Sequence, residues 1–99
     1  MNYILNEAGD PELCDEILRW AAWFETSADA RRVAGTDVGT ARVSTVFLGI
    51  DHAFGDGPPI LYETMVFGGP MDQTQDRYHT KEEALAGHEA MVERVKASQ

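Results

Sequence analysis

The sequence predicts a two-layer α+β domain, in which a three- to four-stranded, mainly antiparallel sheet is covered by two amphipathic helices. Two segments, 42–50 and 60–67, are rich in β-branched and aromatic residues and are typical strands. Two others, 11–25 and 81–96, repeat apolar residues at helical spacing. The chain has 99 residues, enough for one domain and too few for two, so we expect a single domain over 1–99.

The N-terminal part is expected to contain a short strand at 3–5, a turn, and then the first helix. Asp10 is a typical helix N-cap, and Pro11 suits the first helical position, where no N–H is needed. The helix is expected to run from Pro11 to about Glu25, with Leu18 off its apolar face. The residues that share that face are Leu13, Ile17, Trp20, Ala21 and Phe24.

The middle of the chain alternates strands with turn-forming residues, which gives the element order β-α-β-β-β-(β)-α. Glycines and Asp37 between 35 and 39 indicate a turn after a short strand at 31–34. Residues 51–59 contain two glycines and two prolines and are expected to form the loop between the two main strands. The optional last strand is at 76–79.

The second helix begins with a capping box, Thr80 at the N-cap and Glu83 three residues later. Gly87 weakens this helix by about 1 kcal/mol relative to alanine and would permit another backbone to approach closely. His88 falls within the apolar stripe of the helix. The other residues of that stripe are Ala84, Met91, Val92 and Val95.

The net charge and the cysteine content of the chain indicate which partners the protein can bind and in which cellular compartment it is expected. Eight basic residues oppose seventeen acidic ones, a net charge of -9, which disfavours direct binding to nucleic acid or to anionic membranes. An acidic surface suits a protein partner with a basic surface, or it serves solubility alone. Cys14 is the only cysteine, so no internal disulfide forms. No signal peptide and no apolar run of ~18 residues is present, and we expect a cytoplasmic protein.

Glu63 and His88 are the candidates for catalysis. Glu63 shares one face of its strand with Leu61, Met65 and Phe67, and it would be buried if that face forms the core. A buried carboxylate needs a donor, which His88 could supply, and such a pair would have perturbed pKa values suited to acid–base chemistry. A satisfied structural pair is the simpler interpretation of the same two residues.

Binding residues are expected in the loop after the first main strand and at the glycines after the second. Loops on a rigid sheet often carry such residues. Cation binding at the loop is an alternative, but the spacing matches neither an EF-hand nor HExxH, and we expect neither a metal nor a cofactor. The candidate binding residues are Asp51, His52, Phe54, Asp56, Tyr62, Gly68, Gly69 and Arg77.

Several stretches resemble a group of short hypothetical proteins encoded by phages and prophages. The resemblance is carried by residues 43–52, 54–59, 61–67, 77–80 and 83–88. The group supplies no catalytic residues. The resemblance implies a small accessory protein that acts by binding in the host cytoplasm, as a counter-defence or host-takeover factor.

Three functions follow as expectations. The first is a non-enzymatic binding protein that is steered electrostatically to a basic host protein, with aromatic anchors such as Phe54 or Tyr62. Its partner surface is expected at Glu12, Asp15, Glu16 and Trp23.

The second is an oligomeric protein that sequesters a nucleotide signal, a molecular sponge. The 51–59 loop, Gly68-Gly69 and Arg77 would line a pocket between its subunits. The subunits would form a homodimer by pairing the free edges of their sheets. The third is a small enzyme that uses Glu63 and His88, with His52 or His79.

Overall fold

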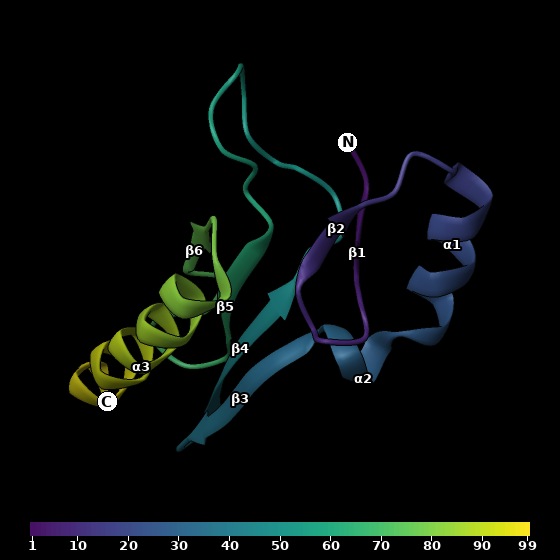
Figure 1. Ribbon diagram of the computed structural model, residues 1–99. Helices are drawn as coiled ribbons and strands as arrows, with labels where there is room; N and C mark the ends of the chain where they lie inside the picture. Colours follow the sequence, from purple (N-terminus) through teal and green to yellow (C-terminus); the bar gives the residue numbers. More distant parts are fainter.

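The computed structural model describes residues 1–99 and confirms the α+β class. Four antiparallel strands form one sheet in the order β3-β4-β5-β6, and β1 pairs with β2 in a separate hairpin. Figure 1 shows α3 beside the larger sheet, with the β1–β2 hairpin and α1 at the other end of the molecule. The elements are β1 (Tyr3–Leu5), β2 (Pro11–Leu13), α1 (Ile17–Thr26), α2 (Ala28–Arg31), β3 (Arg32–Val38), β4 (Ala41–Phe47), β5 (Tyr62–Phe67), β6 (Gln75–Tyr78) and α3 (Lys81–Ser98).

The first part of the core lies between α3 and the middle of the sheet. Alternate residues of β4 and β5 are buried, as expected when one face of a pleated sheet is covered. Val43 and Val66 are fully buried there, beneath the last turns of α3. The buried residues of α3 are those predicted from the apolar stripe: Ala84, His88, Met91, Val92 and Val95.

The second part of the core lies at the opposite end of the same sheet face, where residues of the N-terminal hairpin and of α1 pack against the sheet. Phe47 and Tyr62 are its largest residues, and their rings meet at 5.4 Å between centroids. Trp23 of α1 packs its edge against Phe47, with centroids 6.0 Å apart and planes at 80°. Leu5 of β1 packs against the same cluster. α1 therefore packs at the end of the sheet through Trp23, while α3 lies along it.

The predicted start of the first helix at Asp10 and Pro11 is wrong. The side-chain oxygen of Asn6 accepts hydrogen bonds from the backbone N–H groups of Ala8 and Asp10, each at 3.0 Å, and this closes a tight turn. The chain then returns along β1, and Pro11 lies in β2, opposite Leu5. Strand pairing thus overrides a local helix-start signal, and α1 begins six residues later.

The predicted turn at 35–39 is also shorter in the structure. β3 continues through Gly35 to Val38, paired with β4, and only Gly39 and Thr40 connect the two strands. Gly39 has φ +59°, a conformation that favours glycine. A Cβ at Gly35 would meet only the guanidinium of Arg42 on β4, the end of a flexible side chain, so Gly35 is an ordinary strand position opposite Ser44 rather than part of a turn.

The predicted capping box at the start of the C-terminal helix is confirmed. The hydroxyl of Thr80 accepts from the backbone N–H of Glu83 at 3.1 Å, and the Glu83 carboxylate accepts from the N–H of Thr80 at 3.0 Å. Gly87 does allow a close approach, but of the Tyr78 ring rather than of a backbone. None of the helices has the length and hydropathy that a membrane crossing requires.

Candidate functional site

The proposed contact between Glu63 and His88 is absent. β5 turns Tyr62, Thr64 and Val66 toward α3, so Glu63 points to the opposite face of the sheet. There its carboxylate accepts a hydrogen bond from Nε of Arg77 at 2.9 Å. The prediction that Glu63 is enclosed with His88 is therefore wrong, because the covered face of β5 is the other one.

His88 is buried beneath α3 and is held by hydroxyl groups instead. Its Nδ1 lies 2.7 Å from the hydroxyl of Thr45, and its Nε2 lies 2.9 Å from the hydroxyl of Thr36. Thr45 in turn lies 2.5 Å from the hydroxyl of Thr64. These four residues form a continuous chain of hydrogen bonds across β3, β4 and β5, which we call the His88 network.

The His88 network is closed to substrates. Only 5% of His88 is exposed, and neither Thr45 nor Thr64 is exposed at all. Burial lowers the pKa of His88, so the ring is neutral near pH 7 and donates through one nitrogen while accepting through the other. Because both nitrogens are occupied and no cavity reaches the ring, the network stabilises packing between α3 and the sheet.

The 51–59 loop is organised around Asp51. Its carboxylate accepts from the backbone N–H of Ala53 at 2.7 Å and of Ile60 at 2.9 Å, and these bonds lower the pKa of Asp51. Phe54 is completely exposed at the loop tip, and Asp56 is exposed as well. The structure brings together no group of three His, Cys, Asp or Glu residues that could hold a metal ion.

The remaining predicted binding residues are spread over the sheet. Gly68 and Gly69 follow β5 at the end remote from Tyr62, and Gly68 packs against the carbonyl of Thr40. Arg77 is engaged by Glu63 on the open sheet face. The loop, the two glycines and Arg77 therefore do not line one pocket within a single chain.

The predicted partner surface is exposed at Glu12, Asp15 and Glu16, but not at Trp23, which packs against Phe47. Three apolar residues beside these carboxylates are exposed as well. The periodicity of the sequence predicts Leu13 and Ile17 on the apolar face of the helix and Leu18 off it. Leu13 is 44%, Ile17 59% and Leu18 83% exposed. We call this segment the β2–α1 patch; it consists of Glu12, Leu13, Asp15, Glu16, Ile17 and Leu18.

Leu18 faces outward because the opposite side of α1 is attached to the hairpin, whereas Ile17 lies on the attached side, one turn before Trp20, and is exposed because it stands at the amino end of the helix. The indole N–H of Trp20 lies 3.1 Å from the carbonyl oxygen of Tyr3 and 2.9 Å from that of Gly49. Trp20 also packs on Phe24, with centroids 5.0 Å apart. With one side of α1 fixed in this way, the side chains at its amino end project from the molecule.

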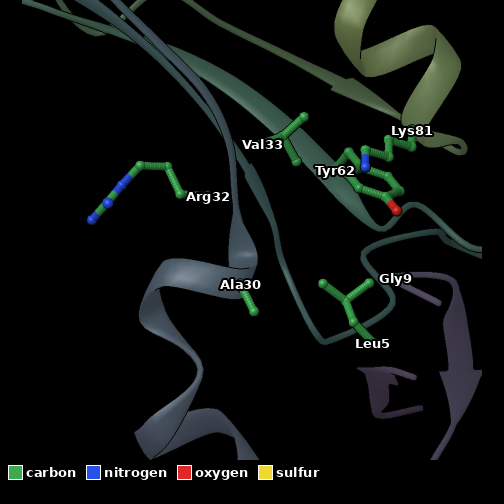
Figure 2. Close-up of a pocket in the computed structure, with 7 residues that line it drawn as sticks. All are labelled: Leu5, Gly9, Ala30, Arg32, Val33, Tyr62 and Lys81. Carbon is green, nitrogen blue, oxygen red and sulfur yellow. The ribbon is translucent and has the colours of Figure 1, made fainter. Parts of the chain in front are cut away.

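A cleft separates the N-terminal hairpin from the start of α3 (Figure 2). It has two adjoining parts of about 100 Å³ and 240 Å³, which share Gly9, Tyr62 and Lys81. Of the predicted binding residues only Tyr62 lines it, because no sequence signal links the hairpin to α3. The other lining residues are Leu5, Ala30, Arg32 and Val33 in the smaller part, and Asp10, Pro11, His79, Thr80 and Glu82 in the larger.

Comparisons with known proteins do not assign a role to any of these residues. No family model, no curated protein and no solved structure matches the chain. The resemblance to phage-encoded proteins therefore stays a prediction.

Proposed function

We propose that the protein is a small non-enzymatic binding protein whose β2–α1 patch docks on a protein partner with a basic surface. The observation that carries the proposal is the exposure of Leu18, at 83%, and of Ile17, at 59%, next to the exposed carboxylates of Asp15 and Glu16. Adjacent exposed apolar side chains bordered by charges are typical of a contact surface.

The physical roles of the two residue types differ. Burying the leucine and isoleucine side chains contributes roughly 25 cal/mol per Å² of apolar surface removed from water, which favours a long-lived complex. The carboxylates of Asp15 and Glu16 attract a basic partner before contact and mainly raise the association rate. The net charge of -9 acts in the same direction over longer distances.

The biological setting of this proposal comes from the resemblance to phage and prophage proteins. A counter-defence or host-takeover factor that acts by occupying a basic host protein in the cytoplasm fits a small acidic binding protein. The separation of Glu63 from His88 removes the reason for proposing acid–base catalysis at that pair.

The test is a comparison of matched variants in affinity purification from host cells, followed by binding kinetics with the recovered partner. Leu18→Asp should abolish recovery, whereas Leu85→Asp, on the half-exposed Leu85 of α3, should not. The double change Asp15→Lys and Glu16→Lys should lower the association rate and its salt dependence.

The matched charge control is Glu89→Lys with Glu93→Lys. It replaces two exposed carboxylates of α3 and changes the net charge of the protein by the same amount. A partner that binds all four variants equally, or the absence of any specific partner, would contradict docking through the β2–α1 patch.

A further inference from the structure

The cleft between the hairpin and α3 has an apolar wall in its smaller part and polar groups in its larger part. Leu5, Ala30 and Val33 supply the apolar wall. Figure 2 shows Tyr62 and Lys81 close together between that wall and the helix. An apolar hollow with a few converging polar groups is the usual form of a small-molecule site.

Tyr62 lines both parts of this cleft, and its buried hydroxyl has no hydrogen-bond partner in the protein. Leaving a buried hydroxyl unpaired costs free energy, and a ligand atom that accepts its proton removes the cost. Burial, and then the nearby charge of Asp10, raise the pKa of Tyr62, so the group stays protonated and can donate.

The amino end of α3 supplies further donors. The helix has 18 residues, and its capping box engages the N–H of Glu83. The N–H groups of Lys81 and Glu82 come earlier, and such first-turn amides have no acceptor within the helix. The positive end of the helix dipole and the ammonium group of Lys81 both favour an anionic group at this point.

The charges around the cleft limit how much negative charge a ligand can carry. Lys81 is cationic, and Asp10 and Glu82 are anionic. The Arg32 guanidinium is paired with Asp29 at 3.3 Å and points away from Tyr62 and Lys81 (Figure 2). A polyphosphate would be repelled by the two carboxylates, whereas a singly charged head can contact the donors and avoid them. The smaller part, of about 100 Å³, limits the apolar body to roughly a single ring.

We propose that this cleft binds a small organic carboxylate. Its apolar body lies against Leu5, Ala30 and Val33, and its carboxylate accepts from the Tyr62 hydroxyl, the Lys81 ammonium group and the first amides of α3. This inference goes beyond the proposed function and uses different residues, so Leu18→Asp in the β2–α1 patch should leave it intact.

The binding test is a titration of the isotopically labelled full chain with benzoate, phenyl phosphate and benzyl alcohol, observed by NMR. Benzoate should bind with a Kd on the order of millimolar, as expected for so small a ligand, and shift the amides of Gly9, Val33, Lys81 and Glu82. Phenyl phosphate should bind more weakly because of its second charge, and benzyl alcohol about tenfold more weakly because it lacks the anion.

Tyr62→Phe should weaken benzoate binding about tenfold and leave the fold unchanged, because the hydroxyl has no partner to lose. Tyr78→Phe is the matched control: its hydroxyl is also buried, but Tyr78 does not line the cleft. Lys81→Met should weaken binding to a similar extent, and Lys96→Met, on the last turns of α3, should not.

Three results would overturn the assignment. The first is the absence of localised shifts at ~20 mM benzoate, a concentration well above the expected Kd. The second is binding of benzyl alcohol or phenyl phosphate as tight as that of benzoate. The third is a Tyr62→Phe variant that binds benzoate like the unaltered protein.

Discussion

The imidazole of His88 on α3 and the hydroxyl of Thr45 on β4 lie 2.7 Å apart in a fully buried position. This hydrogen bond links the helix to the centre of the sheet. The hydroxyl of Thr36 on β3 forms a second hydrogen bond, with Nε2 of the same ring. The polar groups satisfy one another, which avoids the cost of burying them unpaired. The stability of the fold therefore depends on His88 remaining neutral.

We expect stability to fall as the pH decreases through about 6.5, the pKa of an unperturbed histidine. Burial lowers the pKa of His88 in the folded state, so the unfolded chain binds a proton that the folded chain does not. The measurement is the free energy of unfolding in urea at pH 7.5 and pH 5.5, for the natural protein and for His88→Gln.

His88→Gln is neutral at both pH values, so its unfolding free energy should change less between them. The pKa values of Asp51 and Glu83 are lowered by backbone hydrogen bonds, and their contributions are lost only near and below pH 4. An equal loss of stability in both proteins between pH 7.5 and pH 5.5 would rule out His88 as its source.

Gly87→Ala should destabilise the protein by about 1–3 kcal/mol, although alanine is the better helix former. The added Cβ would overlap the Tyr78 ring, which lies against the helix at Gly87. Thermal and urea unfolding measure the effect. In a Tyr78→Ala background the clash is absent, and the same substitution should become stabilising; a stabilising effect in the natural background would contradict the close packing.

Thr80→Ala should cost about 1 kcal/mol, because α3 loses the N-cap hydroxyl that accepts from Glu83. Urea unfolding of this variant is compared with that of Thr40→Ala, an exposed threonine in the β3–β4 turn. Equal stability of the two variants would show that the capping box contributes nothing measurable.

Glu63→Gln should yield a folded protein that is destabilised by less than about 1 kcal/mol. Glu63 pairs with the partly exposed Arg77, and pairs of this kind contribute little to stability. Full biological effect of the variant in infected or expressing cells is the expected result. A folded variant that loses that effect would return Glu63 to consideration as a catalytic residue.

Elements with strong local signals could be predicted from the sequence. The capping box at Thr80 and the apolar stripe of α3 depend on residues within a few positions of one another. The N-terminal hairpin could not be predicted, because Asp10-Pro11 resembles a helix start. Only the turn formed by Asn6 and the pairing of β2 with β1 decide against that helix.

The candidate site shows the same division. Exposure of Glu12, Asp15 and Glu16 follows from their charge, but the exposure of Ile17 depends on where α1 begins and what fixes its inner side. The cleft joins Gly9 to Lys81, residues 72 positions apart in sequence, and no local pattern connects them. Only the tertiary structure brings Tyr62 of β5 beside Gly9 and Lys81, so that the three residues line one cleft.

By itself the sequence determined the class of fold, the two central strands and the C-terminal helix, because periodicity and capping act over a few residues. Tertiary structure alone decided which face of β5 is covered. Both faces of that strand carry apolar residues, so alternation defines two candidate cores without choosing between them. Packing of α3 against Val66 and Thr64 makes the choice, and it places Glu63 outside and His88 inside.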